Sequence, residues 1–438
     1  MDTVSARFEK YQTGIRNFRK ETDLYQVTEL ERRCGTGLSG TMSLYADMLG
    51  DPLCRVRHFP AFAMLVAEVD GSRIVGLVRA GVKDVVCGKK ISNKNHDVVG
   101  KVQHEEPVYA RVGYVLGLRV CPFHRRLGIG LRLAQAIEDW CKDEGAEFVY
   151  MATEKSNTPS IDLFTTKLGY KEIRMLRILV HPVFFHSELV PLNVRVTKLV
   201  TSDALTLYTS VMGSTTFFPR DIDMILQNEL YEGTWIATLK QEEELGLVSI
   251  TQYSNTRSRG SKFVQNLLNG VVNSWAMLSI WKCNEILKLQ VVGVPKKVHA
   301  LATITRFVDH TLPWLKIPSF PDVYSPFGMQ FIFGIHAEGP NGHKLLDALC
   351  CYAHNIAQKH NCQVIMTELS SFDPLANCIP YWKTLSSAND LWCMKYLNNK
   401  ILDEKVTTSY SNHEFSFDSF NWCKSIEEEK IFVDPRDV

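Results

Sequence analysis

The chain has 438 residues, of which 45% are hydrophobic and 22% are charged, and its formal net charge is +1 at pH 7. This length is more than one ordinary hydrophobic core supports, so it predicts two or three domains. The near-neutral charge provides no general attraction to nucleic acid or to an anionic membrane, and we expect neither as a direct partner. An anion site would have to come from a local cluster of cations.

The twelve cysteines are scattered and form no paired CxxC motifs. The first twenty residues are charged and polar rather than a secretory leader, and no apolar run approaches the length of a membrane span. Free, mostly buried thiols are therefore expected, with no bound metal. These features favour a soluble intracellular protein.

Hydrophobic periodicity predicts alternating strands and helices in the first half. In chain order we expect a strand over 15–18, a helix over 24–33, a hairpin of strands 62–70 and 73–86, and a loop over 91–107. A strand over 112–120, an amphipathic helix over 129–144, a strand over 147–153, a helix over 158–168 and a strand over 170–180 follow.

The second half repeats this order. It predicts strands over 194–200, 234–240, 245–252, 327–336 and 363–369, helices over 203–212, 220–231 and 343–359, and loops over 253–265 and 398–425. Phe333-Gly334-Ile335-His336 aligns with Leu116-Gly117-Leu118-Arg119, and Met366-Thr367-Glu368 aligns, with a one-residue gap, with Met151–Glu154. We expect a tandem repeat of one α/β unit. The predicted boundaries are 12–185, 190–400 and a C-terminal tail, 401–438, that packs back on a domain.

The segment that indicates chemistry joins strand 112–120 to helix 129–144. Gly128 and Gly130 let backbone N–H groups converge without Cβ obstruction, and the start of a helix adds unpaired donors and a positive dipole end. Together these features form a cradle for a pyrophosphate. Five cationic or imidazole side chains surround the segment: Arg119, His124, Arg125, Arg126 and Arg132.

Two other interpretations apply to the same glycines. Gly-x-Gly at a helix start also occurs where a helix only packs closely on a strand. A Rossmann dinucleotide site is disfavoured, because the first glycine of GxGxxG is absent and no acidic ribose ligand follows at the expected distance.

Arg125-x-x-Gly128-x-Gly130 after a strand resembles the acyl-CoA signature of the GNAT superfamily of N-acetyltransferases. A second stretch, with Ala152-Thr153-Glu154, Asn157, Leu163-Phe164 and Leu168-Gly169-Tyr170, resembles that superfamily's next conserved segment. The resemblance covers residues 12–180 and implies a mixed α/β (α+β) central sheet flanked by helices. We therefore expect two tandem GNAT-like domains.

A closer resemblance covers nearly the whole chain. The runs RCGTGLSG, YVLGLRVCPFHRRLGIG, FFPRDID, LPWLKIPS, EGPNG and FVDPRD are similar to the plant Hookless-type probable N-acetyltransferases. This resemblance implies a regulatory role in plant development and residence in the nucleus, the cytoplasm or both.

The superfamily resemblance also implies a mechanism. Acetyl-CoA would be the co-substrate, with its pantetheine arm in the gap between strands 112–120 and 147–153, and an amine would attack the thioester directly. The implied cofactor contacts are Leu118, Arg119, Val120, Arg125, Arg126, Leu127, Gly128, Ile129, Gly130, Asn157 and Phe164. The acceptor would be an amine, with a histone or other protein lysine as one candidate, and self-association is allowed.

The sequence departs from the superfamily pattern at the acid and the base. The usual acid tyrosine is absent near Phe164 and Thr165, and Tyr114 stands where some members have a strand glutamate. Glu154 is the best substitute for the base, although a solvated carboxylate at a strand end explains it slightly better. His104, Glu105 and Glu106 are further candidates, from the predicted loop 91–107.

The second half lacks a cationic cradle. It has Glu338-Gly339-Pro340-Asn341-Gly342 in place of the arginines, and Glu338 would repel a pyrophosphate while Pro340 removes a donor. This predicts a degenerate copy without CoA. Two functions stay open at this point: an N-acetyltransferase, or a CoA-binding regulatory or scaffold protein that does not turn over.

Overall fold

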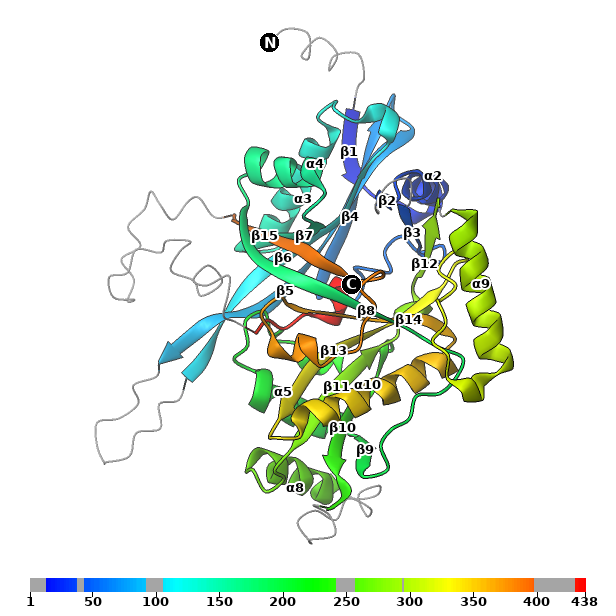
Figure 1. The fold of residues 1–438 in the computed structure, drawn as a ribbon. Helices are drawn as coiled ribbons and strands as arrows, with labels where there is room; N and C mark the ends of the chain where they lie inside the picture. Colours follow the sequence, from blue (N-terminus) through cyan, green and yellow to red (C-terminus); the bar gives the residue numbers. More distant parts are fainter. Residues whose placement is uncertain (1–12, 38–42, 92–104, 242–256, 294, 398–429) are drawn as a thin grey trace, which may run out of the picture.

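One mixed sheet runs through both halves of the chain (Figure 1). The structure is a computed structural model, and it describes residues 13–37, 43–91, 105–241, 257–293, 295–397 and 430–438. Twelve strands are hydrogen-bonded in the order β1-β4-β5-β6-β7-β15-β8-β14-β13-β11-β10-β9, and β12, β3 and β2 form a separate small sheet.

The first half supplies β1 (Thr13–Asn17), α2 (Lys20–Arg33), β2 (Thr36–Gly37), β3 (Ser43–Asp47), β4 (Ala61–Val69), β5 (Arg73–Ile91), β6 (Glu105–Val120), α3 (Ile129–Asp143), β7 (Phe148–Glu154), α4 (Thr158–Ile161), the π-helical η2 (Asp162–Lys167) and β8 (Lys171–Pro182). The second half supplies β9 (Val194–Lys198), α5 (Thr201–Met212), α6 (Ile222–Ile225), β10 (Tyr231–Leu239), α8 (Arg257–Leu268), β11 (Trp275–Trp281), β12 (Lys288–Val292), α9 (Lys296–Thr311), β13 (Gly328–Glu338), α10 (Gly342–Lys359), β14 (Cys362–Ser370) and β15 (Ser387–Tyr396).

The two halves exchange strands at the centre of the sheet. β15, from the second half, pairs antiparallel with β7, and β8, from the first half, pairs antiparallel with β14. β15 and β8 also pair with each other, so they join the two halves. The GNAT-like mixed sheet is confirmed. The domain boundaries 12–185, 190–400 and 401–438 stay predictions.

Helices cover the sheet on both faces. On one face, α3 buries Leu133, Ala134, Ile137 and Cys141 completely. Gly76 on β5 allows this close approach, because a Cβ atom there would lie 2.8 Å from Leu133. In the second half, α10 packs against β11 and β13 in a similar way. A third core extends across both halves and contains Tyr114, Tyr150 and Trp392.

The second half repeats two details of the first. β6 has an extra residue opposite β5 at Gly117 (φ 64°), and β13 has one opposite β11 at Gly334 (φ 61°). A side chain lies beneath each bulge: Arg79 under Gly117 and Tyr208 under Gly334. The sequence alignment of these two segments predicted this correspondence.

Several predicted elements were wrong or incomplete. The predicted loop 253–265 is largely helix α8, the helix 220–231 shortens to α6, and the predicted loop 91–107 ends in strand β6. β10 pairs with β11, a strand that the sequence analysis did not assign, as it also missed β15 and α9. His104 and the predicted segments 245–252 and 398–425 lie outside the described residues.

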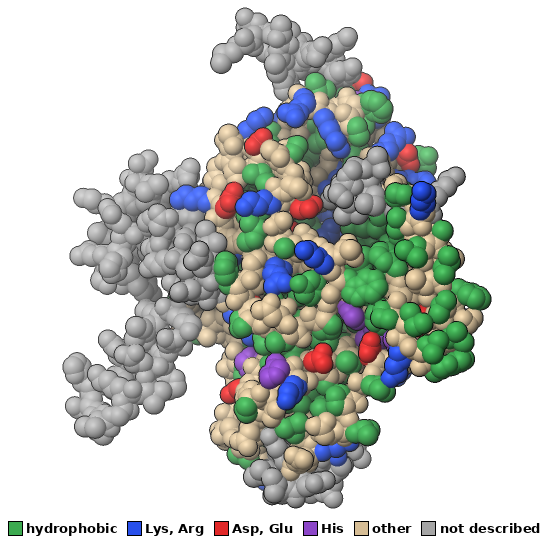
Figure 2. Space-filling model, viewed as in Figure 1, with side chains coloured by type: hydrophobic (Ala, Val, Ile, Leu, Met, Phe, Trp, Pro, Cys, Tyr) green, Lys and Arg blue, Asp and Glu red, His purple; other side chains and the backbone are tan. Residues whose placement is uncertain are grey.

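Helix α9 carries an apolar outer face, which is visible as a green surface in Figure 2. The exposed fractions are 62% for Leu301, 60% for Ile304 and 67% for Phe307, whereas Asp309 on the inner side is fully buried. Asp309 accepts hydrogen bonds from Ser319 and the backbone N–H of Phe185. In the described part of the chain, no helix is long and apolar enough to span a membrane.

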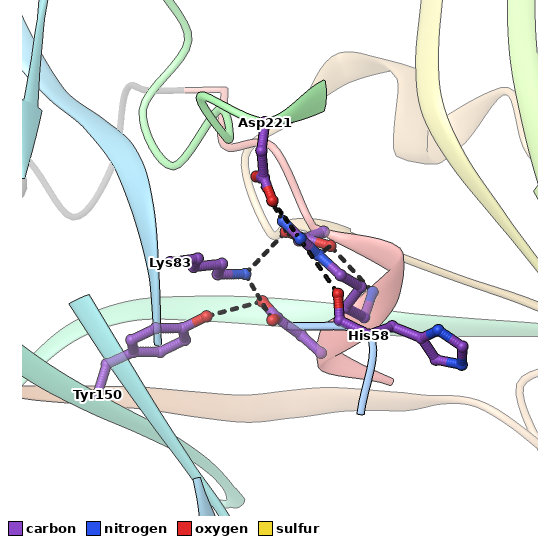
Figure 3. A network of polar contacts seen from close by, with 7 residues as sticks. His58, Lys83, Tyr150 and Asp221 are labelled. Carbon is purple, nitrogen blue, oxygen red and sulfur yellow. Dashed lines mark hydrogen bonds and ion pairs between the residues drawn. The ribbon is translucent and has the colours of Figure 1, made fainter. Parts of the chain in front are cut away.

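The end of the chain lies inside the third core (Figure 3). Lys83 Nζ on β5 lies 3.1 Å from Asp434 Oδ2 and 2.6 Å from Asp437 Oδ1, and all three side chains are buried. Tyr150 donates a hydrogen bond of 2.8 Å to Asp437 Oδ2. Arg436 pairs with Asp434 and with Asp221. Three carboxylates thus meet two cations, so one carboxylate is less fully neutralised than the others.

The incomplete neutralisation of Asp437 predicts how the stability of the protein depends on pH. Burial raises the pKa of Asp437 to about 6, against an ordinary value of 3.8. Below 3.8 the carboxyl is neutral in the folded and the unfolded chain, and between 3.8 and about 6 only the unfolded chain ionises. The contribution of Asp437 to the free energy of unfolding therefore falls as pH rises through this window.

Urea unfolding of wild type and Asp437→Asn, measured from about pH 4 to about pH 7, tests this prediction. Wild type should lose stability relative to the variant as pH rises to about 6, and the difference should be constant above that. Asp373→Asn, another buried aspartate near the end of β14, is the control variant. A difference that does not change with pH would contradict the assignment.

Candidate functional site

The site is the gap that opens between β6 and β7. The two strands pair in parallel at Val112–Phe148, Gly113–Val149 and Tyr114–Tyr150, and no further pair follows. β6 continues to Val120 and β7 to Glu154, so the backbone groups of Leu116–Val120 on that side have no strand partner among the described residues. An extended ligand can enter such a gap and hydrogen-bond to β6 as an added strand does.

The bulge at Gly117 turns the end of β6 away from β7. A Cβ atom at Gly117 would lie 2.8 Å from Nη1 of Arg79, so a larger residue would displace that guanidinium. Arg79 is fully buried and lies 2.8 Å from Glu31 on α2, which also lies 3.6 Å from Arg119. The bulge, a buried ion pair and α2 therefore fix the course of Leu118, Arg119 and Val120.

The cradle follows the end of β6. Gly128 caps α3 with a left-handed backbone (φ 75°), and the first helical hydrogen bond runs from the Arg132 N–H to the Gly128 carbonyl. The N–H groups of Ile129, Gly130 and Leu131 precede that bond, so the helix does not use them. They point out of the helix start, where an anion is stabilised.

Cations flank this helix start. Arg125 and Arg126 are exposed, and Arg125 Nε donates 3.2 Å to the carbonyl of Val120, which holds its side chain beside the strand end. His124 lies 3.2 Å from Arg73, and burial followed by the charge of Arg73 lowers the pKa of the imidazole. The arrangement suits the pyrophosphate of an acyl-CoA.

On the face opposite α3, aromatic side chains line the point where the strands part. The rings of Tyr114 and Tyr150 stack at 4.7 Å, and Tyr150 stacks on Trp392 of β15 at 5.1 Å. Tyr150 OH is bonded to Asp437, but no hydrogen bond among the described residues engages the Tyr114 hydroxyl. Burial raises the pKa of Tyr114 well above its usual value, so this hydroxyl keeps its proton.

Three carboxyl groups lie beyond these rings. Glu154, at the end of β7, is the register partner of Asp390 on β15. Trp392 Nε1 lies 3.2 Å from Asp390 Oδ2 and 3.3 Å from Glu368 Oε1 on β14. Burial, and next the charge of Asp390, raises the pKa of Glu368 well above its usual value, and burial raises the pKa of Asp390.

The sequence analysis missed Asp390 and Glu368 because both belong to the second half. The pairing of β15 with β7 brings Asp390 to the first-half site, and strand pairing between distant segments leaves no signal in local periodicity. A carboxylate inside a predicted strand would have been the available signal, but the analysis assigned no strand to 387–396.

The structure places the remaining predicted residues as follows. Phe164 is buried edge-on to Tyr170 in the core beneath α3, and exposed Asn157 donates 3.1 Å to Thr153 Oγ1. Leu127 is half-buried beside the cradle, Glu106 is exposed near the start of β6, and Glu105 is the first residue of that strand. The cofactor contacts of Phe164 and Asn157, and the catalytic roles of Glu154 and Tyr114, stay predictions.

The corresponding region of the second half is occupied by protein. β13 and β14 part after Phe331–Met366, and a small cavity there is lined by Gly334, Glu368 and the C-terminal residues 430–433. The Asn341 N–H is bonded to Ser274 Oγ and the Gly342 N–H to the Gly339 carbonyl. These donors are used internally, unlike those at the start of α3.

Comparisons with known proteins agree with this geometry. Residues 24–170 match the model of the acetyltransferase (GNAT) family. The chain is 42% identical to the "Probable N-acetyltransferase HLS1" of Arabidopsis thaliana over 427 residues, which cover 97% of this chain and 100% of that protein. It is 34% identical to the "Acetyl transferase GW6a" of Oryza sativa subsp. japonica, covering 88% of this chain and 90% of that protein.

The chain belongs to the GNAT acetyltransferases. Its similarity to the solved N-myristoyltransferase of Saccharomyces cerevisiae with bound myristoyl-CoA is weaker, with a TM-score of 0.48, 8% identity and coverage of 87% of this chain and 78% of that chain. Family membership establishes an acyl-CoA donor and an acetyltransferase activity for the chain. Family membership does not identify the acceptor or the residues that transfer protons.

Gly128→Glu tests the cradle. The substitution places a side chain and a negative charge where the pyrophosphate would approach the helix start, so it should abolish CoA binding measured by calorimetry. The control is Gly169→Glu, because Gly169 has a similar left-handed backbone (φ 77°) and open space around it. Undiminished CoA affinity in a folded Gly128→Glu protein would contradict the assignment.

Proposed function

We propose that this GNAT acetyltransferase moves an acetyl group from acetyl-CoA, bound in the gap between β6 and β7, to the amino group of an acceptor, by direct attack on the thioester. The observation that carries the proposal is the conjunction of an unpaired strand edge, unused N–H donors at the start of α3 and the exposed Arg125 and Arg126. Each of these features matches one part of the donor.

Backbone groups of Leu118, Arg119 and Val120, along the edge of β6 that has no strand beside it among the described residues, would hold the pantetheine arm. One N–H of this edge would polarise the thioester carbonyl, which stabilises the negative charge that develops on its oxygen during attack. The N–H groups of residues 127–130 and the two arginines would bind the pyrophosphate by charge-assisted hydrogen bonds. The acceptor would then approach from the face that carries Tyr114 and Tyr150.

Tyr114 replaces the missing acid tyrosine in this proposal. Its hydroxyl is protonated, has no hydrogen-bond partner among the described residues and lies at the point where the strands part. It can therefore donate a proton to the leaving thiolate. The alternative function, CoA binding without turnover, loses support because groups able to supply and accept protons are present beside the gap.

A protein lysine, with histones as one candidate, is the proposed acceptor class. Lysine has a pKa of about 10.4, so it must lose a proton before attack, and the carboxyl groups beyond Tyr114 favour a cationic acceptor. A regulatory role in plant development, and residence in the nucleus, the cytoplasm or both, are proposals that rest on the likeness to the plant proteins. Self-association stays a prediction.

Release of free thiol from acetyl-CoA tests the function directly. Purified protein should release thiol in proportion to acetylated product when it is given a panel of histone peptides and polyamines. Gly128→Glu, which cannot bind the donor, is the matched control. Calorimetric binding of acetyl-CoA combined with no acceptor-dependent thiol release across the panel would support the non-catalytic alternative.

A further inference from the structure

We infer that Asp390, a residue of the second half, takes the proton from the acceptor amine at the first-half site, and that Glu368 and Trp392 position it. This inference rests on the proposed function and deepens it. The strand exchange is its foundation, because β15 enters the sheet beside β7 and sets Asp390 opposite Glu154.

The geometry places Asp390 on the acceptor face of the sheet. Trp392, two residues along β15, stacks on Tyr150, which in turn stacks on Tyr114, so all four side chains lie on the face opposite α3. Tyr114 itself is 6% exposed and has an unpaired hydroxyl where β6 and β7 part. Asp390 lies opposite Glu154, which follows Tyr150 on β7, so it lies beside the part of β7 that continues past the last pair with β6.

Asp390 is suited to the role because of its neighbours. It is half-buried, so a substrate can reach it, and the Trp392 indole N–H fixes one of its oxygens at 3.2 Å. The same indole N–H lies 3.3 Å from Glu368 Oε1, and burial, then the charge of Asp390, raises the pKa of Glu368 well above its usual value, so Glu368 keeps its proton beside Asp390. Burial raises the pKa of Asp390 above that of a solvated carboxylate, which suits a base.

Glu154 has fewer of these features. It sits at the strand end, and among the described residues no hydrogen bond or ion pair orients its carboxylate. Asp437 is excluded for another reason, because Lys83 and Tyr150 occupy its two oxygens.

The step balances as follows. The acceptor ammonium gives one proton to the Asp390 carboxylate, and the neutral nitrogen attacks the carbonyl carbon of the thioester. The C–N bond forms, and the C–S bond breaks with its electron pair on sulfur. The thiolate takes a proton from Tyr114, which is replenished by the second proton of the attacking nitrogen. The products are the N-acetyl acceptor and CoA thiol, and the Asp390 proton passes to solvent.

The groups around Asp390 and Glu368 affect how kcat/KM depends on pH. The groups that face Asp390 and Glu368 are Glu154 on β7, Trp392 on β15, Tyr114 on β6, Asp437 at the C-terminus and Arg174, the register neighbour of Trp392 on β8. The base works only when ionised, so kcat/KM should rise with pH until Asp390 has lost its proton. This rise is the signature of the base.

Asp390→Asn is the decisive variant. It should lower kcat by about 100-fold or more, the size of a typical general-base contribution, and abolish the rise of kcat/KM with pH. Acetyl-CoA affinity by calorimetry and the unfolding temperature should stay as in wild type, because Asn keeps the shape of the side chain. Glu172→Gln, an exposed carboxylate on the neighbouring strand β8, is the control and should leave rate and profile unchanged.

Glu368→Gln provides a second, independent variant. It should shift the rise of kcat/KM to higher pH, because the amide of Gln is a weaker hydrogen-bond donor to the Asp390 carboxylate than the protonated Glu368 carboxyl, while a merely structural role would leave the profile in place. An unchanged rate and pH profile in both variants, in a wild type that turns over, would overturn the inference but not the proposed function. If only Glu154→Gln abolished the rise of kcat/KM with pH, the base would be Glu154, and the inference about Asp390 would be overturned as well. A wild type without turnover would end both.

Discussion

The parallel pairing of β6 with β7 stops at Tyr114 and Tyr150, and the rest of the site depends on that stop. Backbone groups inside a protein need hydrogen-bond partners, and an edge left open beside a cationic helix start is costly unless a ligand completes it. The bulge at Gly117, held over the buried Arg79, prevents the strands from pairing further. One local backbone feature thus opens the gap that we propose as the donor site.

The second half provides a comparison within the same molecule. β13 and β14 part in a similar way after Phe331 and Met366, but the chain's own residues 430–433 line that gap. The same C-terminal segment continues to Asp434, Arg436 and Asp437, whose ion pairs reach β5 and α6 (Figure 3). The C-terminal segment therefore lines the second gap, and the exchange of β8 and β15 joins the two halves in one sheet around the gap that we propose as the donor site.

Much of the fold, and the elements that form the proposed donor site, could be predicted from the sequence. Helix α3, strands β6, β7, β13 and β14 and the glycine cradle follow from periodicity and from residues whose backbone requirements are local, such as Gly117 and Gly128. The carboxyl group next to Glu154 could not be predicted, because Asp390 reaches it through pairing between strands more than 200 residues apart in the chain. The outward apolar face of α9 could not be predicted either. Amphipathic periodicity predicts that the apolar face of a helix is buried, but in α9 Leu301, Ile304 and Phe307 are exposed and the side with Asp309 is buried.

The central claim is that the chain has one donor site, in the gap between β6 and β7. A crystal of the protein soaked in excess acetyl-CoA tests it most directly. The account predicts one cofactor, with its pyrophosphate at Arg125–Gly130 and its pantetheine arm beside Leu118–Val120, and none at Glu338–Gly342. A cofactor bound at Glu338–Gly342, or bound elsewhere with the gap between β6 and β7 still open, would contradict the account.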